Sequence, residues 1–206
     1  MRKSADLFKS FYWRVSCVDS TASKITALNH DSKLTKRDLA ALYEGLFLQC
    51  VVSFELFIQD MFLGLVTKQI AYPRPVRLLV IFPNMPAAKR IIVKDKYINW
   101  LPYENLRKIS EIYFNQGSNP FSNCPQNHTS EISKAHIIRN YIAHKSDFAW
   151  RKFENTVAAP TRLPAGQQNL LSYFHMTHSP EANKFQYHIG ELVNAARWLS
   201  GLKSRS

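Results

Sequence analysis

A long apolar stretch between Thr35 and about Ile70 constrains the fold more than any other feature of the sequence. Its apolar residues recur at intervals of three and four, which is typical of one face of an α-helix. Thr35 or Ser32 is expected to cap this helix, and Pro73 and Pro75 are expected to stop it. A helix this apolar needs other helices around it, so the stretch predicts an all-α helical bundle. The expected core ladder consists of Leu39, Leu42, Leu46, Cys50, Phe54, Phe57, Met61 and Leu65.

The part of this stretch from Leu46 to Val66 is also long and apolar enough to span a membrane. Four polar residues argue against a span because they would be costly in lipid: Gln49, Glu55, Gln59 and Asp60. We therefore expect a buried helix of a soluble bundle and no membrane partner.

The compartment is predicted from the N-terminus and the cysteines. Met1-Arg2-Lys3 leads into an interrupted, polar segment that does not resemble a signal peptide. Cys17, Cys50 and Cys124 lie far apart without a Cys-x-x-Cys pair, which fits a reducing compartment. A cytoplasmic location is expected.

Further helices are predicted on either side of the apolar stretch, and residues 1–206 are expected to form a single domain. A first helix should cover Asp6 to about Ala27, with Leu7, Phe8, Phe11, Tyr12, Val15 and Val18 on its inner side. Glu104 to Phe114 and Glu131 to about Lys145 should form two more, the second capped by Thr129 or Ser130. A last helix should begin at Ser179-Pro180-Glu181 and end at Gly201. Residues 73–103 are compatible with a small β-hairpin or with a pair of helical turns.

The formal net charge of +12 is large for 206 residues. It favours an anionic partner, with nucleic acid first and an anionic membrane surface second; a surface that is merely solvated is the plain alternative. Nine Lys and Arg residues lie between Lys68 and Lys108, against only Asp95 and Glu104. This segment is expected to make a basic face, with Lys89, Arg90 and Lys94 as candidate RNA contacts.

The richest cluster of chemical groups is the run Arg139-Asn140-Tyr141-Ile142-Ala143-His144. On a helix, Asn140 and His144 are neighbours at positions i and i+4, and His136 extends the same polar stripe by one turn. Arg139 lies between this stripe and the apolar side. An arginine, a carboxamide and an imidazole can bind a phosphate and move a proton without a metal. Lys145, directly after the run, is a further candidate contact to RNA phosphates.

Glu55 is a second candidate, because it lies among apolar residues of the long helix. A buried carboxylate needs a cationic or donor partner, and Arg139 is the expected one. Glu55 would then position Arg139 or share the proton chemistry. The alternatives are an exposed residue and a purely structural ion pair.

The run from Arg139 to His144 resembles the Arg-x4-6-His motif of HEPN domains, and the likeness is nearest to the RiboL-PSP type. The stretch Val51–Phe62, with Glu55 directly after an aromatic residue, is similar to an earlier core helix of that family. Phe114-Asn115-Gln116-Gly117 followed by Asn119-Pro120-Phe121 resembles the segment that leads into the motif. The likeness covers about residues 35 to 200.

This resemblance implies an up-down bundle that forms a homodimer and brings two copies of the motif together. It further implies a metal-independent endoribonuclease that acts as a toxin or antiviral defence effector and is restrained by a cognate antitoxin or another regulatory protein. His144 would be the general acid or base, and Arg139 would stabilise the phosphorane. Asn140 would orient the imidazole or donate to a phosphate oxygen. Some HEPN toxins carry a tyrosine two residues after the histidine, where this chain has Ser146.

Two rival functions remain open. One is a non-catalytic HEPN module that binds RNA or nucleotides or serves as a scaffold. The other is a protein that binds membrane surfaces or helices through charge and aromatic residues. No metal or cofactor is expected, because the chain has no His-Glu-x-x-His motif, no Cys–His cluster and no glycine-rich phosphate loop.

Overall fold

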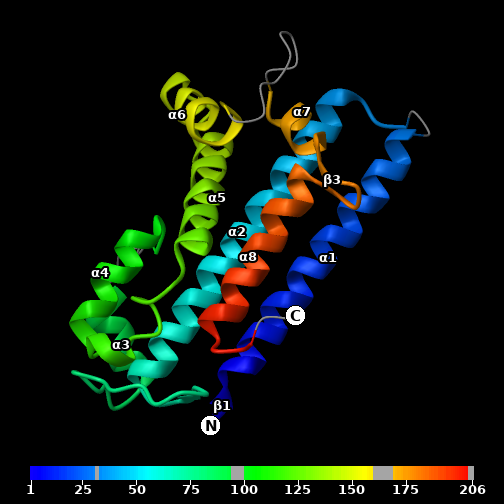
Figure 1. Ribbon diagram of the computed structural model, residues 1–206. Coiled ribbons are helices and arrows are strands. Elements are labelled where there is room, and N and C mark those ends of the chain that lie inside the picture. Colours follow the sequence, from blue (N-terminus) through cyan, green and yellow to red (C-terminus); the bar gives the residue numbers. More distant parts are fainter. Residues whose placement is uncertain (31–32, 94–99, 160–168, 204–206) are drawn as a thin grey trace.

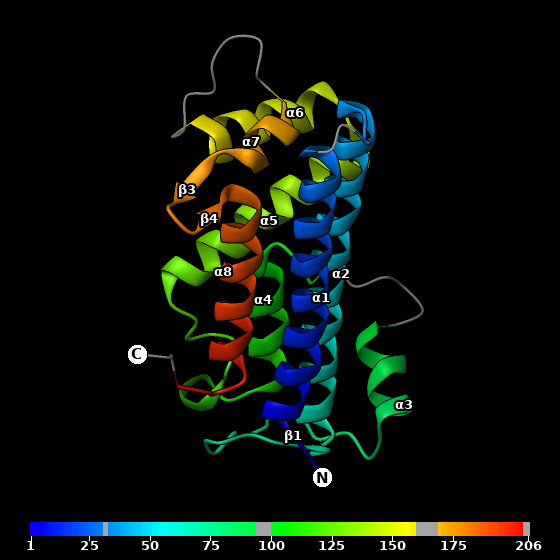
Figure 2. The same ribbon diagram turned by 90° about the vertical axis from the view of Figure 1, so that its right-hand side faces the viewer.

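The computed structural model of the chain describes residues 1–30, 33–93, 100–159 and 169–203. These residues are mostly helical, and the few strands are two or three residues long. The predicted all-α class is therefore confirmed. Three helices of the bundle, α1 (Ser4–His30), α2 (Lys36–Val66) and α8 (Lys184–Leu199), lie side by side in both views (Figures 1 and 2). Helix α5 (Gln126–His144) packs against α2 and α8.

Helix α2 begins where the sequence predicts, at the Thr35 cap. The Thr35 hydroxyl accepts from the Asp38 backbone N–H, and the Asp38 side chain accepts from the Thr35 N–H in return. The helix ends at Val66, before both prolines, so the expectation that they stop it is wrong. The chain turns at Lys68, whose φ is 54°, and returns over Gly64. A Cβ at Gly64 would lie 2.2 Å from Ile70 Cδ1, so only glycine allows this close return.

The predicted core ladder of α2 is correct at Leu39 and from Cys50 onward, and it is wrong at the two positions between them. Leu42 is 40% exposed and Leu46 is only partly buried, whereas Tyr43 and Phe47 are buried. The reason is that α8 packs on this side: the ring of Phe185 contacts both Tyr43 and Phe47. Tyr12 on α1 is likewise exposed, whereas the other predicted inner residues of that helix are buried.

The segment after α2 forms helical turns in its described part, in line with the second of the two predicted alternatives. A short helix α3 (Met85–Ala88) continues as the π-helical turn η1 (Lys89–Val93). Residues 94–99 lie outside the described residues. Strand β2 (Ile70–Ala71) pairs in parallel with β1 (Arg2–Lys3), at the N-terminal end of α1.

The chain then forms α4 (Tyr103–Tyr113), close to its predicted bounds, and the 3-10 turn η2 (Gln116–Ser118). Helix α5 starts at Gln126 after Pro125, so the predicted cap at Thr129 or Ser130 is wrong. A proline, which lacks a backbone N–H, is tolerated here because the first N–H groups of a helix have no acceptor within the helix.

Three short elements between α5 and α8 were not predicted: α6 (Asp147–Phe153), the π-helical turn η3 (Glu154–Ala158) and α7 (Leu170–His175). Ser179-Pro180-Glu181 does not begin the last helix but turns the hairpin of β3 (Thr177–Ser179) and β4 (Ala182–Asn183). Helix α8 starts instead at the Asn183 cap, and the chain leaves it at Gly201, with φ of 72°.

Helix α2 is long and apolar enough to cross a membrane by length and composition alone. Within its most apolar window, 61% of the residues are buried inside the molecule. The same properties are found in the central helix of a bundle, and α2 lies between α5 and α1 (Figure 1).

Candidate functional site

The candidate site lies where α5 ends and α6 begins. Lys145 closes α5 in a left-handed conformation, with φ of 47°, and its N–H donates to the carbonyl of Tyr141. The Ser146 hydroxyl caps α6 by accepting from Ala149. The ring of Tyr141 packs on Trp150 and Phe153, with centroids 5.2 and 5.6 Å apart, which fixes α6 against the last turn of α5.

Three of the polar residues on α5 are joined by hydrogen bonds. Arg139 Nη1 donates to Asn140 Oδ1 over 3.1 Å, and Asn140 Nδ2 lies 3.0 Å from His136 Nε2. An amide N–H can only donate, so His136 Nε2 is the acceptor. The predicted extension of the stripe to His136 is therefore observed, and Asn140 couples the guanidinium to an imidazole.

His136 is only 8% exposed, and its Nδ1 has no hydrogen-bond partner among the described residues. Burial, together with the smaller effect of the positive charges of Arg139 and Lys152, lowers the pKa of His136 to about 4. His136 is consequently neutral near pH 7. It holds Asn140 in place and does not compete with Arg139 as a cation.

His144 lies one turn beyond Asn140 and is exposed. It makes no hydrogen bond or ion pair with another described residue. Its imidazole is thus accessible to a ligand, next to the exposed Lys145 and within little more than one turn of Arg139. The helix places Arg139, Asn140 and His144 in one region, but no direct contact joins His144 to the other two.

Glu55 is buried, at 6% exposed, as the sequence predicts. The expected ion pair with Arg139 is absent from those formed within 4.0 Å by the described residues, which corrects that expectation. The reason is the alignment of α2 and α5. Lys145 contacts Glu44, so Arg139 lies level with about residue 50, and Glu55 is roughly 8 Å further along α2 at ~1.5 Å per residue.

Lys145, a predicted RNA contact, forms an ion pair with Glu44, with 2.6 Å between Nζ and Oε2. Beside this pair is an open groove of about 860 Å³ between α2, α5 and α7. Tyr141 and Glu44 form one side of the groove, and the exposed Lys36 and Arg37 lie at its margin. Of the described residues of α5, only Tyr141 lines this groove.

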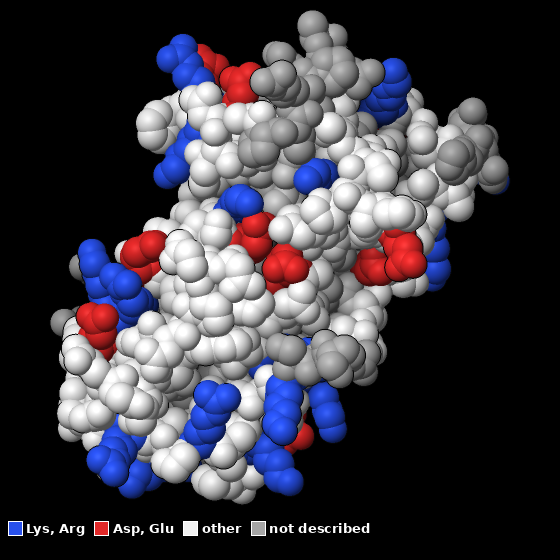
Figure 3. Space-filling view, viewed as in Figure 1, with Lys and Arg blue, Asp and Glu red and all other residues white. Residues whose placement is uncertain are grey.

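The other predicted RNA contacts are at the opposite end of the bundle. Lys89 and Arg90 are exposed on η1, whereas Lys94 lies outside the described residues. Figures 1 and 2 place α3, which leads into η1, at the end with β1, and α6 at the other end. Figure 3 shows Lys and Arg side chains gathered at the end with β1. The predicted basic face is thus separate from the Arg139–His144 region.

A buried polar network was missed from the sequence. Glu131 Oε2 lies 3.6 Å from His188 Nδ1, and the Tyr173 hydroxyl lies 2.7 Å from His188 Nε2. Lys134 Nζ contacts the other oxygen of Glu131 at 2.6 Å, and together these partners hold the pKa of Glu131 near 2 against the effect of burial. The network joins α5, α7 and α8, and His188 within it is 2% exposed and therefore closed to a substrate. Its only sequence signal is a histidine between the apolar residues Phe185 and Ile189.

Among the described residues there is no group of three or more His, Cys, Asp and Glu side chains that could hold a metal. Comparison with known proteins found no matching family model, no matching curated protein and no matching solved structure.

Proposed function

We propose that this protein is a metal-independent endoribonuclease whose active site is formed by Arg139, Asn140 and His144 at the end of α5. One observation carries the proposal: an exposed imidazole lies little more than one helical turn from an arginine whose orientation is fixed through Asn140 and His136. The net charge of +12 supports a polyanion as the ligand. The resemblance of the run 139–144 to the HEPN motif points to RNA.

The chemistry follows from the groups that are present. His144 removes the proton from a ribose 2′-hydroxyl, and the 2′-oxygen forms a bond to the adjacent phosphorus. The bond from phosphorus to the 5′-oxygen breaks, and that oxygen takes a proton from solvent or from a second imidazole. Arg139 stabilises the negative charge that grows on the phosphate oxygens. The products carry a 2′,3′-cyclic phosphate and a 5′-hydroxyl.

A homodimer would supply the second imidazole. In this proposal two copies of α5 face each other, so that two arginines and two histidines surround one phosphate. Phe148 supports an interface here, because it is 79% exposed only four residues after His144.

Within the same proposal, the protein is a cytoplasmic toxin or antiviral defence effector, and an antitoxin or regulatory protein would act by covering this end of the molecule.

The experiment that tests this function is cleavage of end-labelled single-stranded RNA in EDTA. We expect His144→Ala and Arg139→Ala to lower the rate by at least about 100-fold, in line with the loss of an acid–base group or of charge stabilisation. His178→Ala and Arg14→Ala are matched controls, because both residues are exposed and lie on other elements. Cleavage that persists in both the His144→Ala and Arg139→Ala variants would show that these residues do not form the active site.

A non-catalytic module that binds RNA or nucleotides is the second candidate. The observation that favours it is the separation of the basic end, with Lys89 and Arg90, from the Arg139–His144 region. Such a module would bind RNA in the His144→Ala variant as in the wild type and would cut none. Charge reversal at Lys89 and Arg90 would abolish its binding.

A further inference from the structure

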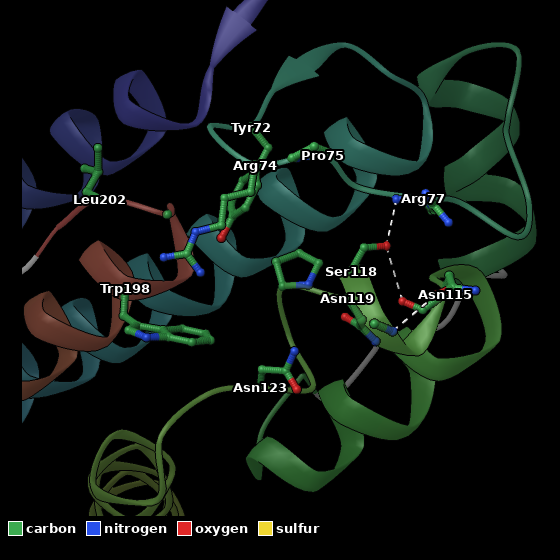
Figure 4. A pocket seen from close by; sticks show the side chains of 13 residues that line it. Tyr72, Arg74, Pro75, Arg77, Asn115, Ser118, Asn119, Asn123, Trp198 and Leu202 are labelled. Carbon is green, nitrogen blue, oxygen red and sulfur yellow. Dashed lines mark hydrogen bonds between the residues drawn. The ribbon is translucent and has the colours of Figure 1, made fainter.

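A cavity of about 540 Å³ lies far from the Arg139–His144 region, at the other end of α5. Three segments that are distant in sequence form its walls: the chain after β2, the connection between α4 and α5, and the C-terminal turn of α8 (Figure 4). Its volume is in the range of sites that enclose small molecules. We call it the Trp198 cavity.

The walls of the Trp198 cavity combine aromatic rings with permanent cations. Trp198 and Tyr72 contribute rings, and Arg74 contributes a guanidinium group; Arg77 also lines the cavity, but its side chain points away from Trp198 in Figure 4. No Asp or Glu is among the described residues that line it. Figure 4 shows Arg74 extending from its loop toward the side on which Trp198 lies. A ligand with a flat ring and an anionic group matches this pair of walls.

Hydrogen bonds hold the walls in place before any ligand arrives. The backbone N–H of Arg77 donates to Ser118 Oγ over 2.8 Å, and the backbone N–H of Asn115 donates to the Arg77 carbonyl over 2.9 Å. Asn119 is 1% exposed; its side chain donates to Ser110 and Ser122 and accepts from the Phe121 N–H. The Asn119 side chain therefore makes its hydrogen bonds within the wall of the cavity. Because this wall is already held in place, it needs little rearrangement when a ligand binds.

Other amides in the cavity are available to a ligand. Asn123 is exposed and forms no hydrogen bond with another described residue. The Asn115 side-chain oxygen accepts from the Gly117 backbone N–H, and its NH2 group forms no hydrogen bond with another described residue. Amide groups that donate and accept hydrogen bonds match the polar edge of a nucleobase, whereas a purely hydrophobic ligand would form no hydrogen bonds with them.

We propose that the Trp198 cavity binds a nucleotide, with the base against Trp198 and the phosphate at Arg74. Two sources share this chemistry: a free mononucleotide, and an unpaired nucleotide within an RNA strand. Helix α5 has 19 residues and is therefore about 28 Å long, which separates the cavity, next to its N-terminal end, from His144. The site is thus additional to the proposed ribonuclease site and does not depend on it.

The test is calorimetric titration of the full chain with AMP, adenosine and inorganic phosphate. AMP should bind about tenfold or more tightly than either fragment, because only AMP engages both walls.

Arg74→Ala should weaken AMP binding by about tenfold, and Trp198→Leu should do the same. Arg14→Ala, an exposed arginine on α1, should bind AMP as the wild type does. Circular dichroism melting confirms that each variant is folded, and Arg74 is exposed, so its removal spares the core.

A second arm separates the two sources. If a single-stranded RNA decamer displaces AMP from the wild type, the cavity accepts a nucleotide of an RNA strand; if it does not, the ligand is a free mononucleotide. Absence of AMP binding at millimolar concentration would overturn the proposal, and so would equal binding by the Arg74→Ala and Arg14→Ala variants. AMP lacks the phosphodiester that the ribonuclease chemistry needs, so this result is independent of whether the protein cuts RNA.

Discussion

Asn140 couples the charged and neutral groups of α5, because it accepts from Arg139 and donates to His136. Sequence periodicity could place these residues on one stripe but could not show that His136 is buried. That burial depends on how α5 lies in the bundle, which no local pattern encodes. His144 was predictable as a polar residue at the helix end, and its exposure agrees with that position.

The burial of His136 predicts a loss of stability in mild acid. Its folded-state pKa of about 4 lies below the ordinary value of 6.5, so the unfolded chain binds the proton more tightly. The free energy of unfolding should be fully retained above about pH 6.5 and should fall by up to roughly 3 kcal/mol as the pH drops to about 4. Protonation would also break the bond in which Asn140 donates to Nε2.

Urea unfolding between pH 7 and pH 4 measures this loss. His136→Gln cannot titrate, so its free energy of unfolding should fall less over the same window. Burial also lowers the pKa of His188, so part of the decline should remain in that variant. An identical pH dependence in the wild type and His136→Gln would contradict the role assigned to His136.

At the scale of elements, the sequence predicted the long helices well and the short ones poorly. The Thr35 cap and the spacing of Phe54, Phe57, Met61 and Leu65 are local signals, and α2 follows them. Leu42 and Tyr43 are adjacent and both apolar, so only the position of α8 decides which is buried. Helices α6 and α7 are too short to show a clear period, and the rings of Trp150 and Phe153 place α6 through contacts with α5.

The same reasoning applies to the lack of contact between Glu55 and Arg139. Each residue was predicted on the correct helix, and Glu55 was correctly expected to be buried. Their offset along the two helices follows from tertiary packing, for which the contact between Lys145 and Glu44 is the marker. Sequence spacing carries no information about that offset.

The end of α2 offers a test of how the chain returns over Gly64. Gly64→Ala would bring a methyl group against the buried Ile70, and we expect a loss of about 1–3 kcal/mol in the free energy of unfolding. Gly45 is the matched control on the same helix, because a Cβ there meets nothing within 4 Å. Gly45→Ala should be neutral or stabilising by up to about 1 kcal/mol.

Urea denaturation of both glycine variants measures these changes. If Gly64→Ala were as stable as Gly45→Ala, the close packing of β2 on α2 would be wrong.

At the scale of the whole molecule, the proposed paired site requires two chains. Phe148 is 79% exposed beside the candidate site, and Ile112 is 61% exposed on α4, remote from it. If two copies meet at the α5–α6 end, Phe148→Asp should convert a dimer into a monomer and reduce RNA cleavage, whereas Ile112→Asp should do neither. Sedimentation equilibrium at the concentration of the cleavage assay gives the state of association. A wild-type monomer with full activity would refute the paired site.

The central claim is tested most directly with two versions of one RNA oligonucleotide that the wild type cuts in EDTA. The first version is unmodified, and the second carries a single 2′-O-methyl group at the cut position. The account predicts that the unmodified strand yields a 2′,3′-cyclic phosphate, that the methylated position resists, and that His144→Ala cuts neither strand. Cleavage at the methylated position, or undiminished cleavage by His144→Ala, would contradict it.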